Sequence, residues 1–207
     1  TLMGGPIDAR RSPTAVNRFA LEHPYAWFAS NVIHRVPHGH PGVGRAVYPG
    51  FLQLGAFVMM NPVRHLGSYR DYWFDQLNDP TCERAVAHEK FYDEYCAVLD
   101  MDAAYYLDTV RDVFQEFALA KGTWRIAGQL VRPSDITTTA LFTIEGALDD
   151  ISGPGQTEAA HGLCTGIADA RRRHHVAADC GHYGIFSGRR WRESIYPELR
   201  DFIRSHA

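Results

Sequence analysis

Apolar side chains recur with a helical period in the middle of the chain. Between Asp102 and Ala118 they fall on one face of a helix with 3.6 residues per turn, at positions 103, 106, 107, 110, 113, 114 and 117. Most positions between them are acidic or otherwise polar. The pattern predicts a helix with one buried and one acidic face, within a helical region that runs from Thr81 to Lys121.

Two further helices are predicted from the residues that start and stop helices. A Ser-Pro pair at 12–13 is typical of a capping residue followed by proline at the first helical position. The His-Pro pair at 23–24 ends such a segment, so we expect a helix over about 13–22. Asn61-Pro62 gives the same starting signal, which predicts a helix after it.

The last third of the chain has the pattern of a small parallel α/β unit. Residues 137–146, TTTALFTIEG, are β-branched and apolar almost without interruption, as in a central parallel strand covered on both faces. A second strand is predicted over 173–181, with a crossover helix over 156–167 and a closing helix over 187–203. Residues 1–8 indicate the end of another buried strand, followed by a Gly-Gly-Pro turn.

These elements predict an α/β fold in which a helical cap is inserted into a parallel-sheet domain. We expect residues 1–22 to hold the end of a core strand and a helix, and residues 23–132 to form the helical cap or lid. Pro133 interrupts the helical pattern, so we expect residues 133–207 to form the C-terminal α/β core segment.

Composition excludes several classes of protein. The 207 residues are 45% hydrophobic and 22% charged, which is ordinary for a globular domain. A net charge of −3 gives no general attraction to nucleic acid or to an anionic membrane, and no apolar run approaches the ~18 residues of a membrane span. Four scattered cysteines without a C-x-x-C pair suit reduced thiols. Since the start also lacks a signal-peptide pattern, we expect a cytoplasmic protein.

Three histidines in one loop are the first candidates for a metal site. His34, His38 and His40 lie in a segment rich in proline and glycine, but no acidic residue stands between Glu22 and Asp71 to complete the ligands. We therefore expect neither a metal nor another cofactor.

Polar residues that follow the two late strands are the candidates for catalysis. Asp149 comes just after the first of these strands and His182 just after the second, and active sites of open α/β sheets lie at the carboxyl ends of strands. A carboxylate that orients an imidazole supplies two of the three members of a nucleophilic triad. The alternative is that Asp149 caps a helix and His182 is an ordinary loop histidine. Asp150 is the second choice for the acid.

The chain offers a weak candidate for the nucleophile. The one G-x-C-x-G match, Gly162 to Gly166, follows the acid and lies within the predicted crossover helix, whereas a nucleophile turn directly follows a strand. We therefore expect Cys164 to be buried late in that helix, with Gly166 as its C-cap.

Three segments resemble the C-terminal region of intracellular polyhydroxyalkanoate (polyhydroxybutyrate) depolymerases. They are TLMGGPIDARRSPTAVN, DITTTALFTIEGALDDISGPGQT and CGHYGIFSGRRWRESIYPELRDFI. Members of that family are α/β-hydrolases that cleave the ester bonds of amorphous storage polyester with a Cys-Asp-His triad. The resemblance implies that Asp149, the first Asp of E-G-x-x-D-D, is the acid and that His182, in G-H-Y-G, is the base.

The resemblance also implies what the chain lacks. The cysteine of the family lies in the N-terminal half, and no residue here matches it, so the chain would begin at roughly the sixth strand of the sheet. The implied partners are a polyhydroxyalkanoate granule, as substrate, and the N-terminal half of the same protein. The implied location is the cytoplasm, at the surface of storage granules.

Other functions stay open. The chain would also fit another ester-cleaving α/β-hydrolase or a polyester synthase-like acyltransferase, because polyester synthases use the same three residue types. Alternatively, it would be a non-catalytic module that binds granules through its aromatic helices. For any single aromatic residue of PYAWF or YRDYWF, packing in a core is a commoner role than lining a substrate groove.

Overall fold

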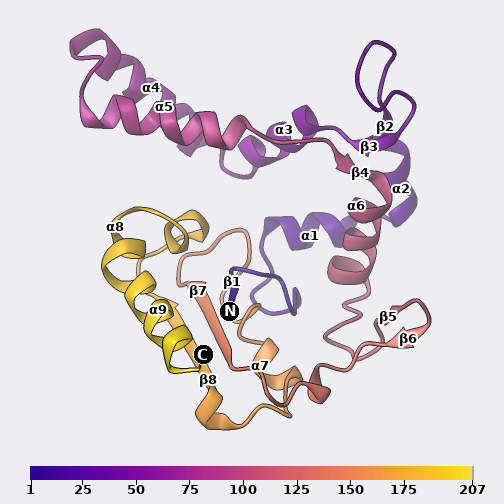
Figure 1. Ribbon diagram of the computed structural model, residues 1–207. Coiled ribbons are helices and arrows are strands. Elements are labelled where there is room, and N and C mark those ends of the chain that lie inside the picture. Colours follow the sequence, from indigo (N-terminus) through magenta and orange to yellow (C-terminus); the bar gives the residue numbers. More distant parts are fainter. Residues whose placement is uncertain (207) are drawn as a thin grey trace. The chain divides into compact units, whose positions relative to one another are not determined.

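The computed structural model describes residues 1–206 (Figure 1). The chain forms two compact units, which we call the sheet unit and the helical unit. The sheet unit contains Thr1–Pro24 and the chain from Asp108 onward, and the helical unit is Tyr25–Leu107. The role of residues 23–132 as a cap stays a prediction.

The sheet unit is built on three parallel strands in the order β1 (Leu2–Met3), β7 (Leu141–Gly146) and β8 (Arg172–Ala177). All six residues of β7 are buried, which confirms the central parallel strand predicted from its apolar run. Successive side chains of a β-strand point to opposite faces of the sheet, so those of β7 alternate between two cores. Phe142 and Ile144 pack with residues from the end of the chain, whereas Leu141 packs with Ala160, Cys164 and Ile167.

The sheet unit also contains helical segments. They are α1 (Ala15–Glu22), η1 (Val110–Gln115, a π-helical segment that continues α6, Ala103–Thr109), η2 (Pro133–Asp135), α7 (Ala160–Leu163), η3 (Asp169–Arg171), η4 (His182–Ile185), α8 (Gly188–Arg190), η5 (Trp191–Ile195, also π-helical) and α9 (Tyr196–Ser205). A short hairpin joins β5 (Arg125–Ile126) to β6 (Gln129–Leu130).

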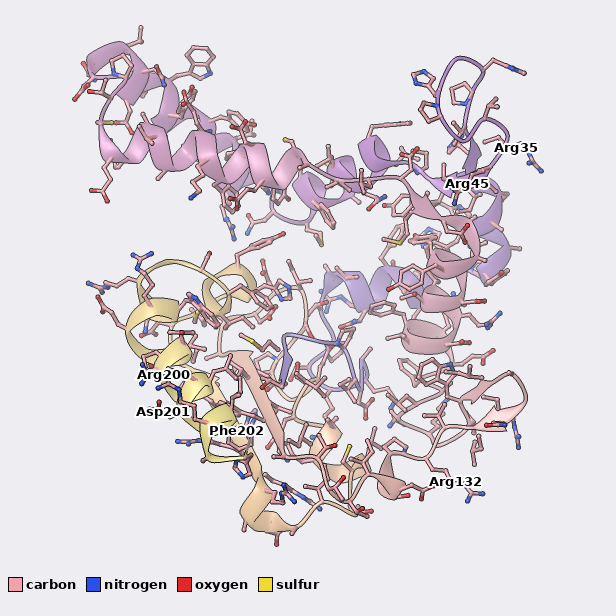
Figure 2. The ribbon with its side chains drawn as sticks, in the orientation of Figure 1. Arg35, Arg45, Arg132, Arg200, Asp201 and Phe202 are labelled. Carbon is pink, nitrogen blue, oxygen red and sulfur yellow. The ribbon has the colours of Figure 1, made fainter. Side chains whose placement is uncertain are left out.

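The closing helix has one buried and one exposed face, as its sequence pattern predicts. The predicted helix over 187–203 corresponds to the helical run from Gly188 to Ser205. Phe202 is buried with its ring 5.0 Å from that of Phe142, while the neighbouring Arg200 and Asp201 form an ion pair at the surface (Figure 2). One face of α9 therefore fixes the helix to the sheet, and the other faces water.

Two expectations about the crossover helix are wrong. Only Ala160–Leu163 is α-helical. The residues just before it form turns, with Ala160 N–H donating to Thr157 O, and the N–H groups of Thr157 and Glu158 donate to the Glu145 side chain. Cys164, not Gly166, is the C-cap. Glycine is needed at 166 for a different reason: a Cβ there would meet the carbonyl oxygens of Ser134 and Ile136, the latter at 2.8 Å.

The helical unit contains α2 (Tyr25–Asn31), α3 (Gly50–Met60), α4 (Pro62–Asn78), α5 (Glu83–Cys96) and the start of α6 (Ala103–Thr109). The predicted start after Asn61-Pro62 is confirmed, since the Asn61 side chain accepts a hydrogen bond from the N–H of Arg64 at 3.3 Å. A small antiparallel sheet of β2 (His34–Arg35), β3 (Ala46–Tyr48) and β4 (Met101–Asp102) was not predicted.

Helices α4 and α5 form a hairpin with a polar and aromatic interface (Figure 1). His65 Nδ1 lies 2.8 Å from the hydroxyl of Tyr92, and the hydroxyl of Tyr72 donates to Glu89 at 2.7 Å. The other side of α4 presents five large apolar residues, each more than half exposed, which we call the apolar face of α4: Val63, Leu66, Trp73, Phe74 and Leu77. None of the helices within residues 1–206 combines the length and the hydropathy that a membrane span requires.

We expect Gly166→Ala to destabilise the sheet unit by on the order of 1–3 kcal/mol, because the backbone around residues 134–136 must move to admit the methyl group. Gly162→Ala, four residues earlier, is the matched control. It lies in α7 with nothing within 4 Å of the added Cβ, so it should leave stability equal or higher by up to ~1 kcal/mol. Denaturant unfolding measures both. Equal midpoints for the two variants would contradict the packing described here.

Candidate active site

The two parallel strands bring the loops that carry Asp149 and His182 to one edge of the sheet. Hydrogen bonds between these loops continue the β7–β8 ladder beyond the strands: Ala147 N–H donates to Ala177 O at 3.0 Å, and Leu148 N–H donates to Cys180 O at 2.9 Å. Asp149 follows directly, and His182 opens the short helix η4. The sequence order of strands thus places both candidates at the carboxyl end of the sheet, as predicted.

Asp149 and His182 form a direct hydrogen bond. His182 Nδ1 lies 2.8 Å from Asp149 Oδ2, which confirms the predicted contact. The other carboxylate oxygen, Oδ1, accepts from the N–H groups of Ile151 at 2.9 Å and Ser152 at 2.8 Å. Because the Asp149 side chain is buried and both its oxygens are engaged, its direction towards the imidazole is fixed.

This hydrogen bond also decides which imidazole nitrogen is available for chemistry. A carboxylate can only accept, so Nδ1 carries the proton and Nε2 keeps its lone pair in the neutral ring. The side chain of His182 is 19% exposed, which leaves room for a reacting group to approach. Asp150, the second choice for the acid, is an exposed neighbour of Asp149.

The imidazole is held from several sides. Gly4, which follows β1, has a φ of +54°, and a Cβ there would lie 3.0 Å from His182 Cε1, so glycine is required by both conformation and space. The ring of Phe186 meets the imidazole edge to face with 5.5 Å between the centroids. Phe186 is also partly exposed, so an apolar surface adjoins the candidate base.

Hydrogen bonds fasten the loop after Asp149 to the first residues of the chain. The Thr14 hydroxyl donates to Ile151 O at 3.1 Å, and the Thr157 hydroxyl donates to Gly5 O at 2.8 Å. Buried Gln156 donates to the Asn17 side chain at 2.8 Å. The segment that begins the chain therefore contributes to the shape of the site, although it is far from Asp149 in sequence.

The cysteines of the sheet unit lack the features of an activated nucleophile. Cys164 packs against Leu141, the first residue of β7, whereas Asp149 follows the other end of that six-residue strand, roughly 16 Å away at ~3.3 Å per residue. Burial raises the pKa of the Cys164 thiol, and burial likewise raises that of Cys180 in the opposite core. A nucleophilic cysteine needs a lowered pKa.

One buried charged residue beside the site escaped the sequence analysis. Glu145 is the penultimate residue of β7 and is 1% exposed. Its signal was present: a glutamate stands in an otherwise apolar or β-branched strand, where an unpaired charge would be strongly unfavourable. Among residues 1–206, no three His, Cys, Asp or Glu side chains are grouped as a metal site would require.

Comparison with known proteins gives one match. A family model described as the PHB de-polymerase C-terminus matches residues 4–207. A search of curated proteins and a search of solved structures each returned no match.

Proposed function

The chain belongs to the PHB depolymerase C-terminus family, and on that premise we propose that it supplies the acid and the base of a polyester-hydrolysing enzyme. The substrate is poly(3-hydroxybutyrate)-type storage polyester. The observation that carries the proposal is the 2.8 Å hydrogen bond from His182 to buried Asp149 at the carboxyl end of a parallel sheet. The nucleophile is a cysteine upstream of this chain, in the N-terminal half of the same protein.

The proposed reaction proceeds through a thioester. His182 Nε2 takes the proton of the thiol as sulfur bonds to the ester carbonyl carbon, and Asp149 stabilises the imidazolium that results. When the carbon–oxygen ester bond breaks, His182 returns the proton to the departing alkoxide. Water then attacks the thioester, His182 accepts a proton from that water, and the thiolate leaves and is reprotonated. The carboxylic acid is released and the enzyme is regenerated.

The proposed enzyme has a larger sheet than the one in this chain. The three parallel strands would be the last part of an α/β-hydrolase sheet, with the nucleophile turn and the oxyanion-hole amides upstream. The enzyme would act in the cytoplasm at the surface of storage granules. An acyltransferase that forms polyester would use the same residue types, but it would extend the polymer instead of releasing hydroxyacid.

In the protein that carries the nucleophile, we expect Asp149→Asn to lower kcat by about 10⁴-fold, because the imidazole loses the carboxylate that selects its tautomer. His182→Ala should lower it by at least as much, since the same ring serves both half-reactions. Asp150→Asn and His38→Ala are matched controls at exposed positions and should stay within about twofold. Hydroxyacid release from amorphous polyester is the measurement. Full activity in either site variant would remove that residue from the mechanism.

A second function, adsorption to the polymer, is favoured by the apolar face of α4. Its five residues lie within an arc of roughly 100° on the helix, at the ~100° per residue of an α-helix. The only charged side chain of α4 within that arc is Arg70, which forms an ion pair with Asp71 at 2.7 Å. A neutral, water-insoluble polyester offers apolar surface without charges, so burial of these side chains would stabilise the adsorbed state. Adsorption of this kind does not require the catalytic pair.

We expect Leu66→Glu to weaken binding of the chain to amorphous polyester particles by at least about tenfold, since burying one such side chain contributes about 1.5–3 kcal/mol. Leu99→Glu is the control, because Leu99 is as exposed but lies outside α4. Sedimentation of the particles with bound protein measures the affinity. If the two variants bind equally, the apolar face of α4 has no part in adsorption.

A further inference from the structure

The carboxylate of Glu145 is buried in the sheet unit beside the candidate site. The residue lies in the central strand β7, is 1% exposed and points to the same side of the strand as Thr143. Burying an ionised carboxylate is unfavourable unless hydrogen bonds replace its lost water. The partners of Glu145 therefore indicate what the residue does.

Three backbone N–H groups supply those hydrogen bonds. Gly155 donates to Oε2 at 2.7 Å, while Thr157 and Glu158 donate to Oε1 at 2.6 and 2.9 Å. All three donors lie in the turns between Asp149 and α7, where no helical or strand ladder would satisfy them. One side chain thus fixes the far end of the loop of residues 147–159, which contains Asp149.

The anchored turn acts on both members of the catalytic pair. Asp149 holds the first turn of the loop through Ile151 and Ser152, and Glu145 holds the last, so the loop is fixed at both ends. Thr157, held by Glu145 through its N–H, also donates its hydroxyl to Gly5 O. Gly5 adjoins Gly4, where a Cβ would lie 3.0 Å from Cε1 of the His182 ring.

We propose that Glu145 is a positioning residue for the Asp149–His182 pair, an inference that rests on the proposed function of that pair. Its carboxylate sets the path of the loop from residue 147 to residue 159 and, through Thr157 and Gly5, the wall behind the imidazole. Glu145 does not touch the reacting atoms. It acts on the reaction by keeping Asp149 Oδ2 in line with His182 Nδ1.

Glu145→Gln is the variant that isolates this role. The amide keeps the size of the side chain. Its NH2 group, however, would face a backbone N–H of the turn, and because both groups are donors, one hydrogen bond would be replaced by a repulsive contact. Glu158→Gln makes the same charge change in the same loop on a half-exposed side chain and is the matched control. In the protein that carries the nucleophile, Glu145→Gln should lower kcat roughly 10- to 100-fold with KM within about twofold, since a small misplacement of catalytic groups lowers the rate. Glu158→Gln should change neither constant.

A spectroscopic readout separates positioning from simple loss of stability. In this chain, the proton on His182 Nδ1 should give a slowly exchanging, downfield NMR signal that Asp149→Asn removes. Glu145→Gln should broaden or shift that signal at temperatures well below its unfolding transition, and Glu158→Gln should preserve it. An unchanged signal and unchanged kcat in folded Glu145→Gln would overturn the proposal.

Amide hydrogen exchange tests the anchor without any substitution. The N–H groups of Gly155, Thr157 and Glu158 should exchange slowly although they lie outside regular secondary structure, and rapid exchange would overturn the proposal even if Glu145→Gln fails to fold. The proposed function fails separately. If Asp149→Asn keeps full activity, the pair is not catalytic, whereas an inactive Asp149→Asn with a fully active Glu145→Gln rejects only the role of Glu145.

Discussion

The parallel pairing of β7 with β8 is the interaction on which the candidate site depends. The register pairs Gly146 with Ala177 at the ends of the strands, and two further backbone hydrogen bonds join the loops that follow. From these ends, a few residues carry Asp149 and His182 into contact. Each side of β7 is covered by its own apolar cluster, so a shift of register by one residue would move Phe142 and Ile144 out of their core. The core thereby fixes the distance between the two catalytic candidates.

Polar burial gives the site its rigidity. Asp149, Glu145, Gln156 and Thr157 are all buried, and hydrogen bonds within the sheet unit satisfy their side chains. Such groups are costly to bury without partners, so the loop has few alternative conformations that keep every partner. Removing one member would therefore leave other buried donors or acceptors unsatisfied, and the effect would spread along the loop.

The sequence was most informative where a pattern is local or continuous. The uninterrupted apolar run predicted β7 as a central strand, Asn61-Pro62 predicted the start of α4, and the positions of Asp149 and His182 after two strands predicted their contact. The helix expected over 103–117 is also present, although it passes into a π-helical segment and ends at Gln115. The assignment of the pair to catalysis stays a proposal, supported by the family match and by the hydrogen bond between the two side chains.

Elements that depend on distant partners could not be predicted. The strands β2, β3 and β4 have two or three residues each, too few to leave a periodic pattern, and β4 is more than 50 residues from its partner β3. The N–H groups that precede α7 donate to the side chain of Glu145 in β7, a contact that no local sequence pattern shows. The sequence pattern led to the interpretation of Gly166 as a helix cap. Its close approach to residues 134–136, which requires glycine, arises only in the folded chain and leaves no local signal.

The measurement that tests the account most directly is hydroxyacid release from amorphous poly(3-hydroxybutyrate) by two proteins, the chain alone and the chain joined to the sequence that precedes it in its gene. The account places the acid and the base here and the nucleophile upstream. It predicts turnover by the joined protein and none by the chain alone, because Asp149 and His182 have no activated nucleophile to serve. Turnover by the chain alone at an ordinary enzymatic rate would contradict it.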